Sequence, residues 1–157
     1  MKKRLIAAAL CVAALDYSVI ARADDRLVRF DGGIGVVPVS APSAANTVLG
    51  VLPGGQPWVI SRLTADVRSD GHITVDGRGL LFAGGNAIGT NGNQVVHAVL
   101  FCGGVPSNSS AVALQPNGDF GIDSALDPIP PDPCASPVLL IVNAGGRWFA
   151  AGIPKLP

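Results

Sequence analysis

Apolar and polar residues alternate at every second position along two neighbouring stretches of the chain. In residues 58–68, Leu63, Ala65 and Val67 share one face, and the polar side chains between them share the other. A period of two is typical of a β-strand that is buried on one side. Residues 69–71 favour a turn, and the same alternation returns over 72–83. The pattern therefore predicts a β-hairpin.

Strand-length apolar runs recur along the rest of the chain between glycine-, proline- and asparagine-rich segments. These predicted strands cover residues 27–30, 34–39, 47–52, 94–102, 111–114, 120–122, 138–143 and 147–152. We also expect loops or turns at 31–33, 84–93 and 103–110, a hairpin joining 111–114 to 120–122, and a proline-rich connector at 127–137. No helix is predicted beyond the N-terminal segment. The pattern predicts an all-β fold, an antiparallel β-sandwich of about nine strands.

The N-terminal segment has the three parts of an export signal. Basic residues at 2–4 precede an apolar run at 5–15, and Ala21 and Ala23 have the spacing that an export peptidase recognises. The run is shorter than the roughly 20 apolar residues that cross a membrane. We expect a signal peptide over 1–23, cleavage before Asp24, and one domain over 24–157 with no membrane span. Such a protein is exported, and is then periplasmic or secreted.

Cleavage changes the charge of the chain. The signal carries four of the 11 basic residues and one of the 11 acidic residues, so the mature chain has a formal charge of −3. A surface with few cations releases few counterions from a phosphate backbone and is weakly attracted to anionic lipid. We therefore expect neither nucleic acid nor a membrane surface as a partner. The expected ligand belongs to the cell envelope or the medium.

Two cysteines, Cys102 and Cys134, remain in the mature chain. An even pair in an oxidising compartment favours a disulfide. A metal or redox thiol pair is the alternative, but the spacing is not C-x-x-C and no histidines cluster nearby. We expect the bridge to pin the proline-rich connector to the strand at 94–102.

Residues with metal-binding or catalytic chemistry are few. His72 and His97 are the two histidines, and the predicted strands that carry them are neighbours. A shared metal site is one interpretation, and an exposed His72 with a buried His97 is the other. Asp76 is predicted to share the outward face of His72. There is no G-x-S-x-G motif and no P-loop lysine, so we expect no catalytic residue, no metal site and no cofactor.

Trp58 and Trp148 are the two tryptophans, and the mature chain has no tyrosine. Exposed aromatic rings often bind carbohydrate, so both are candidate surface contacts for a ligand, and packing in the core is the alternative. The candidate ligand or metal contacts are therefore His72, His97, Asp76, Trp58 and Trp148.

Three segments resemble a family of small exported bacterial proteins of unknown function. They are PWVISRL at 57–63, DGRGLL at 76–81 and WFAAGI at 148–153. A second similarity, to chordin-type domains, is carried by GIGVVPV at 33–39 and GTNGNQVV at 89–96. The histidines of the chordin-type motif are absent, because GNAI stands at 85–88. These resemblances imply a bacterial origin and a sandwich architecture, with no activity and no metal role.

The sequence favours a non-catalytic exported β-sandwich protein that acts through surface or loop contacts. The alternative is a small exported hydrolase or metal-binding protein that uses His72 or His97 with a nearby aspartate. In the second case, an imidazole must lie within hydrogen-bond reach of a carboxylate.

Overall fold

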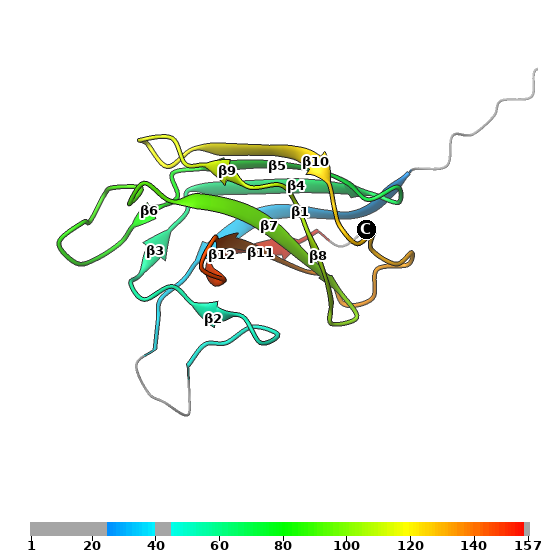
Figure 1. The fold of residues 1–157 in the computed structure, drawn as a ribbon, viewed down its shortest axis with the longest axis horizontal. Helices are drawn as coiled ribbons and strands as arrows, with labels where there is room; N and C mark the ends of the chain where they lie inside the picture. Colours follow the sequence, from blue (N-terminus) through cyan, green and yellow to red (C-terminus); the bar gives the residue numbers. More distant parts are fainter. Residues whose placement is uncertain (1–24, 40–44, 156–157) are drawn as a thin grey trace, which may run out of the picture.

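The computed structural model describes residues 25–39 and 45–155. In these ranges the chain is all-β, without a helix, which confirms the predicted fold class (Figure 1). The predicted signal peptide, including Ala21, Ala23 and Asp24 at its expected cleavage point, lies outside the described residues. No helix among the described residues is long and apolar enough to cross a membrane.

Twelve strands are found in the part of the chain that the structure describes. They are β1 (Arg26–Gly35), β2 (Leu52–Pro53), β3 (Trp58–Val59), β4 (Arg62–Arg68), β5 (His72–Arg78), β6 (Leu81–Phe82), β7 (Val95–Cys102), β8 (Val105–Asn108), β9 (Val112–Ala113), β10 (Phe120–Ala125), β11 (Val138–Asn143) and β12 (Arg147–Pro154).

Ten strands form one sheet that curls so that its two halves face each other (Figure 1). The strand order is β10-β5-β4-β1-β12-β11-β7-β8, with β2 added to β12 and β9 added to β7. Strands β3 and β6 form a small second sheet. A backbone bridge joins the two halves where Asn108 exchanges hydrogen bonds of 2.8 and 2.9 Å with Asp127. Both halves therefore enclose a single core.

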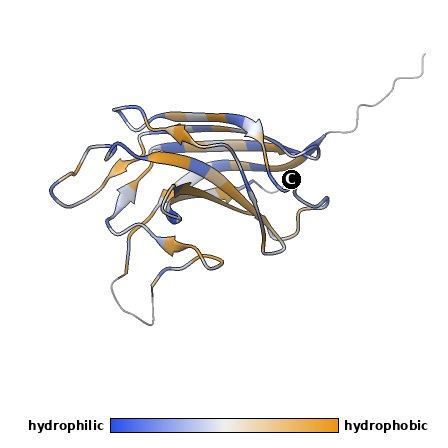
Figure 2. Cartoon of the chain, viewed as in Figure 1, coloured by the Kyte–Doolittle hydropathy of each residue, from blue (hydrophilic) through white to orange (hydrophobic). Residues whose placement is uncertain are grey.

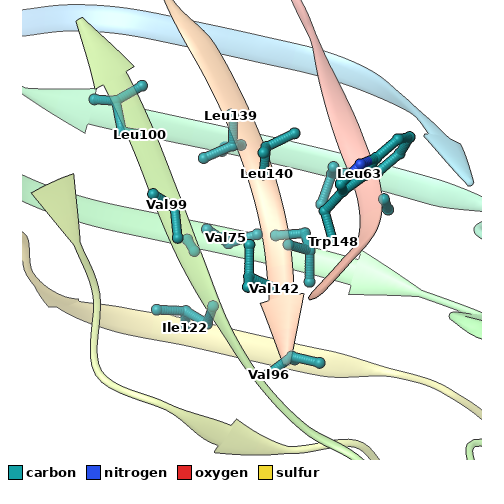
Figure 3. Packing of buried hydrophobic residues seen from close by; sticks show 14 of the residues in the cluster. Leu63, Val75, Val96, Val99, Leu100, Ile122, Leu139, Leu140, Val142 and Trp148 are labelled. Atoms are coloured by element: carbon teal, nitrogen blue, oxygen red, sulfur yellow. The ribbon is translucent and has the colours of Figure 1, made fainter. Parts of the chain in front are cut away.

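Hydrophobic and hydrophilic residues alternate along several strands (Figure 2), and the hydrophobic residues are the buried ones. On β4, Leu63, Ala65 and Val67 are buried, and the residues between them are partly exposed. On β5, Ile73 and Val75 are buried on either side of the exposed Thr74. Strand β11 is buried on both faces from Leu139 to Val142. Figure 3 shows side chains from β7, β11 and β12 packed with residues of β4, β5 and β10. Sequestering these side chains supplies most of the driving force for folding.

The predicted strand boundaries are wrong in several places. Residues 31–33 do not turn, because β1 continues through them with a register shift between Phe30 and Gly33. The two glycines at 32 and 33 accommodate such a bulge. The predicted strands 58–68 and 72–83 are each divided, into β3 and β4 and into β5 and β6. The predicted loop 103–110 contains β8, which pairs with β7.

The predicted hairpin between 111–114 and 120–122 is also wrong, although its turn forms. Gln115 and Asp119 are joined by a backbone hydrogen bond of 2.9 Å across that turn. Beyond it the strands diverge, because β9 pairs with β7 and β10 pairs with β5. The turn signal is local, whereas the partner of each strand is set by contacts far away in sequence.

The predicted disulfide is present. Cys102 at the end of β7 is bonded to Cys134, and their Cα atoms lie 4.8 Å apart. The backbone N–H of Gly103 also donates to the carbonyl of Ala135. The bond fixes the connector between β10 and β11 to the end of β7, beside the last strand of the sheet order, β8.

Candidate functional site

A pocket of about 290 Å³ opens where loops meet at one end of the sheet. The loop between β2 and β3 contributes Gly54, Gly55 and Gln56, and the turn between β11 and β12 contributes Asn143 and Arg147. Aromatic rings from β3, β6 and β12 complete the lining. We call this site the aromatic pocket. Its volume suits a small molecule.

Three stacked rings build the wall of the pocket. The ring centroids of Phe82 and Phe149 each lie 4.1 Å from that of Trp58, and Phe149 is nearly parallel to the indole at 14°. Trp58 and Phe149 are only 2% and 4% exposed, whereas Phe82 is half-buried. Such ring pairs add roughly 0.5–1.5 kcal/mol beyond their buried area. The three rings therefore pack closely together in the lining of the pocket.

A bulge in β12 brings Phe149 into this stack. Ile141 pairs with Ala150 and the next residue, Val142, pairs with Trp148, so Phe149 is the extra residue. A bulge redirects side chains at one point of a strand. Here it allows the adjacent Trp148 and Phe149 both to be buried, at 7% and 4% exposure.

Gly54 allows the backbone to lie close to the rings. Its N–H donates to the carbonyl of Trp148 at 2.9 Å, which fixes it beside β12. A Cβ at Gly54 would lie 3.0 Å from the ring of Phe149 and 3.3 Å from Nε1 of Trp58. The indole N–H of Trp58 therefore lies beside Gly54, which also lines the pocket.

The polar groups of the pocket are unequally satisfied. Asn143 donates through Nδ2 to Oε1 of Gln94 at 3.2 Å, and its Oδ1 accepts the backbone N–H of Arg147 at 2.9 Å. By contrast, Nε1 of Trp58 and the guanidinium of Arg147 have no hydrogen-bond partner among the described residues. The exposed side chain of Gln56 is also unpaired within that part of the chain.

The loop at 83–94 is anchored by one buried asparagine that the sequence analysis did not identify. Asn91 is 9% exposed, and its Nδ2 donates to the carbonyls of Leu114 and Gln115 at 3.0 and 2.9 Å. Its Oδ1 accepts the N–H of Asn93 at 3.0 Å. An asparagine before a glycine marks a turn, but the sequence does not show that its side chain is buried. The anchor holds the loop that carries Ala87 against the aromatic pocket.

The structure separates the two histidines. Strands β5 and β7, which carry His72 and His97, have four strands between them in the sheet, so the expectation that they are neighbours is wrong. The sequence shows strand content, but long-range pairing decides strand order. No group of three or more histidine, cysteine, aspartate or glutamate residues within 25–39 and 45–155 is placed to hold a metal ion.

His72 has a carboxylate partner. Its Nε2 lies 2.8 Å from Oδ1 of Asp123 on β10, and the two side chains are 38% and 77% exposed. The backbone N–H of His72 donates to Oδ1 of Asp70 at 2.9 Å. No hydroxyl or thiol of the described residues is bonded to the imidazole. This pair therefore supplies two parts of a hydrolytic triad without a nucleophile.

His97 lies in a second, more apolar groove of about 370 Å³ on the outer face of β7. Val99, Phe101 and Val142 line this groove, and Leu49 lies at its edge. Burial lowers the pKa of His97 because desolvation disfavours the imidazolium. The imidazole has no hydrogen-bond partner in the described part of the chain.

Asp76 belongs to an ion-pair cluster that joins β5 to the turn before β10. Nε of Arg78 lies 2.7 Å from Oδ1 of Asp76, and Nη1 lies 3.1 Å from Oδ2 of Asp119. A hydrogen bond from the Gly79 N–H, with further help from Arg78 and Asn117, lowers the pKa of Asp119. The hydrogen bonds from Arg78 to Asp76 and Asp119 raise the pKa of Arg78. Asp76 is thus engaged in a structural network.

No family model, curated protein or solved structure matches the chain. The resemblances to small exported bacterial proteins and to chordin-type domains stay predictions. Of the predicted site residues, only Trp58 lies in the aromatic pocket, and Trp148 lies behind it with Nε1 bonded to the carbonyl of Asn46 at 3.0 Å.

Proposed function

We propose that this chain is an exported, non-catalytic binding protein whose small-molecule ligand occupies the aromatic pocket. The observation that carries the proposal is the indole N–H of Trp58, which has no hydrogen-bond partner among the described residues although the residue as a whole is only 2% exposed. Nε1 is not among the fully buried atoms without a partner, so this donor keeps solvent access beside the pocket that Trp58 lines. An acceptor group of a ligand can take the place of water there.

The lining of the pocket supports binding over catalysis. Among the described residues, it is made of glycine, alanine, amide and aromatic side chains with one arginine. General acid–base and nucleophilic catalysis need a histidine, carboxylate, hydroxyl or thiol close to the reacting atoms. A lining without these groups holds a ligand without transforming it.

Export is supported by two independent features. The N-terminal residues have the pattern of a signal peptide, and the Cys102–Cys134 pair suits an oxidising compartment. We expect the protein recovered from a bacterial periplasm or culture medium to begin at Asp24. Mass spectrometry of the intact protein tests this, and an unprocessed N-terminus in the cytoplasmic fraction contradicts it.

The binding proposal is tested by the effect of small molecules on the melting temperature. We expect a subset of a chemically diverse set, metals and sugars included, to raise Tm, because a ligand that binds only the folded state stabilises it. Ala87→Phe should fill the pocket and abolish the rise. Ile88→Phe is the matched control, since Ile88 is 64% exposed on the same loop and does not line the pocket.

Turnover is the outcome that decides against this function. Hydrolysis of an ester or glycoside by the purified protein, retained in Ala87→Phe and lost in His72→Ala, would establish the alternative of a small hydrolase. The His72–Asp123 contact of 2.8 Å is the observation that favours this alternative. We expect no such turnover, because both side chains lie in solvent and lack a bonded nucleophile.

A further inference from the structure

We infer that the aromatic pocket binds a small organic carboxylate, an anionic group on an apolar body. The inference rests on the proposed function and names the chemistry of its ligand. It follows from which polar groups of the pocket are already engaged and which are free.

The free groups are mainly donors. The side-chain oxygens of Gln94 and Asn143 both accept hydrogen bonds within the protein. The indole N–H of Trp58 and the guanidinium of Arg147 are unpaired among the described residues, and neither can accept a hydrogen bond. Among the described side chains of the lining, only the exposed Gln56 amide offers a free acceptor as well as a donor. A ligand that satisfies this set is rich in acceptors.

The charge of the pocket has one sign. Arg147 is the only ionisable residue in the lining, and no carboxylate of the described residues pairs with it. Its backbone N–H donates to Oδ1 of Asn143 at 2.9 Å, and its exposed side chain lines the pocket. Arginine binds carboxylates through two parallel N–H donors. An anionic acceptor therefore fits the pocket better than a neutral one.

The rest of the pocket lining is mainly apolar, and the volume of the pocket limits the size of the apolar part of the ligand. Phe82 is half-buried and Ala87 faces the same space, so both offer apolar surface to a ligand. A volume of about 290 Å³ is at the lower end for pockets that enclose small molecules. A single ring bearing one carboxylate matches both the size and the chemistry.

Two-dimensional ¹H–¹⁵N NMR tests the inference through the tryptophan side chains. The protein has two tryptophans and therefore two indole N–H cross-peaks, which Trp148→Phe assigns. We expect benzoate to shift the Trp58 cross-peak and leave that of Trp148 in place, because Nε1 of Trp148 is already bonded to Asn46. Benzamide, which lacks the charge, and acetate, which lacks the ring, should each bind at least roughly fivefold more weakly.

Arg147→Gln should weaken benzoate binding roughly five- to tenfold, since it removes the cation and keeps a donor. Its effect on benzamide should be smaller than twofold. Arg68→Gln is the matched control, because Arg68 is an exposed arginine on β4 outside the pocket. Equal weakening of both probes by Arg147→Gln would overturn the carboxylate inference.

The outcomes separate this inference from the proposed function. If benzamide shifts the Trp58 cross-peak as readily as benzoate, the pocket binds small molecules and the anion preference is wrong. If no probe up to about 10 mM moves that cross-peak and no compound raises Tm, both the inference and the proposed function are wrong.

Discussion

The two ends of strand β7 differ in how completely their polar groups are satisfied. At the Cys102 end, the disulfide and the backbone bond from Gly103 to Ala135 fix the neighbouring connector. At the other end, Gln94 precedes the strand and lines the aromatic pocket, where two donors lack a partner among the described residues. One end is thus held by a covalent bond, and the other carries the free donors on which the proposed binding function rests.

The two tryptophans show the same contrast on a smaller scale. Trp148 and Trp58 are 7% and 2% exposed, so burial alone does not distinguish them. Nε1 of Trp148 donates to the carbonyl of Asn46 at 3.0 Å, whereas Nε1 of Trp58 has no partner in the part of the chain that the structure describes. Hydrogen-bond satisfaction therefore separates a structural aromatic residue from a candidate ligand contact more sharply than exposure does.

The largest expected effect on stability comes from removing the disulfide at the Cys102 end of β7. Replacing both Cys102 and Cys134 by serine should lower the free energy of unfolding by about 3.7 kcal/mol in the chain-entropy model, because the bond closes a loop with a sequence separation of 32. Urea denaturation of both proteins measures the loss. The folded variant should keep the Trp58 indole cross-peak and its response to benzoate. A changed Trp58 response would show that the two ends are not independent.

The tryptophans provide the second test. Trp148→Phe should destabilise by about 2 kcal/mol, since it leaves a cavity and removes the hydrogen bond to Asn46. Trp58→Phe leaves a similar cavity but breaks no internal hydrogen bond, so its cost should be about 1 kcal/mol smaller. Benzoate binding should be lost in Trp58→Phe and retained in Trp148→Phe. Equal destabilisation by the two variants would contradict the expected difference between the bonded N–H of Trp148 and the free N–H of Trp58.

Local sequence patterns predict the disulfide-bonded part of the molecule better than the part that forms the aromatic pocket. The alternation in β4 and β5 sets which side chains are buried, and Cys102 with Cys134 could be paired from composition and compartment alone. The strand order could not, because the turn at 115–119 forms while β9 and β10 find different partners.

The aromatic pocket is harder to predict for the same reason. Its rings come from β3, β6 and β12, and the bulge that turns Phe149 inward leaves no signal in a run of apolar residues. The sequence marks Trp58 as a candidate contact because of its residue type. Its free N–H depends on Gly54, whose position is fixed by a bond to Trp148.

The ion-pair cluster around Asp119 allows a test of the turn that holds Asn91, the residue that anchors the loop beside the aromatic pocket. Asp119 accepts from Gly79 and Arg78 at the turn whose Gln115 carbonyl accepts from Asn91. Because its pKa is lowered in the folded state, its stabilisation is present above its unfolded pKa and is lost as pH falls through the folded value. Asp119→Asn should therefore be less stable than the wild type at neutral pH, and this gap should narrow below about pH 4.

Thermal unfolding at several pH values measures that gap. We expect it to be smaller than the effect of Trp148→Phe, because the cluster is solvated. Asp123→Asn is the control, since Asp123 is 77% exposed and contacts His72 on another part of the sheet. A gap that stays constant down to low pH would contradict the role given to the Asp119 carboxylate.

The smallest effect is expected from His97, which lies on β7 between the two ends. Burial lowers its pKa below 6.5 in the folded state, so the unfolded chain binds the proton more readily. Its contribution to stability is complete above pH 6.5 and decreases as pH falls below that value. As pH is lowered from about 7.5 to about 5.5, the free energy of unfolding of His97→Gln should therefore fall by less than that of the wild type. His72→Gln is the matched control and should keep the decrease due to His97. If the stability of His97→Gln follows the wild-type curve at every pH, the pKa of His97 is the same in the folded and unfolded states. The outer face of β7 then does not exclude water from the imidazole.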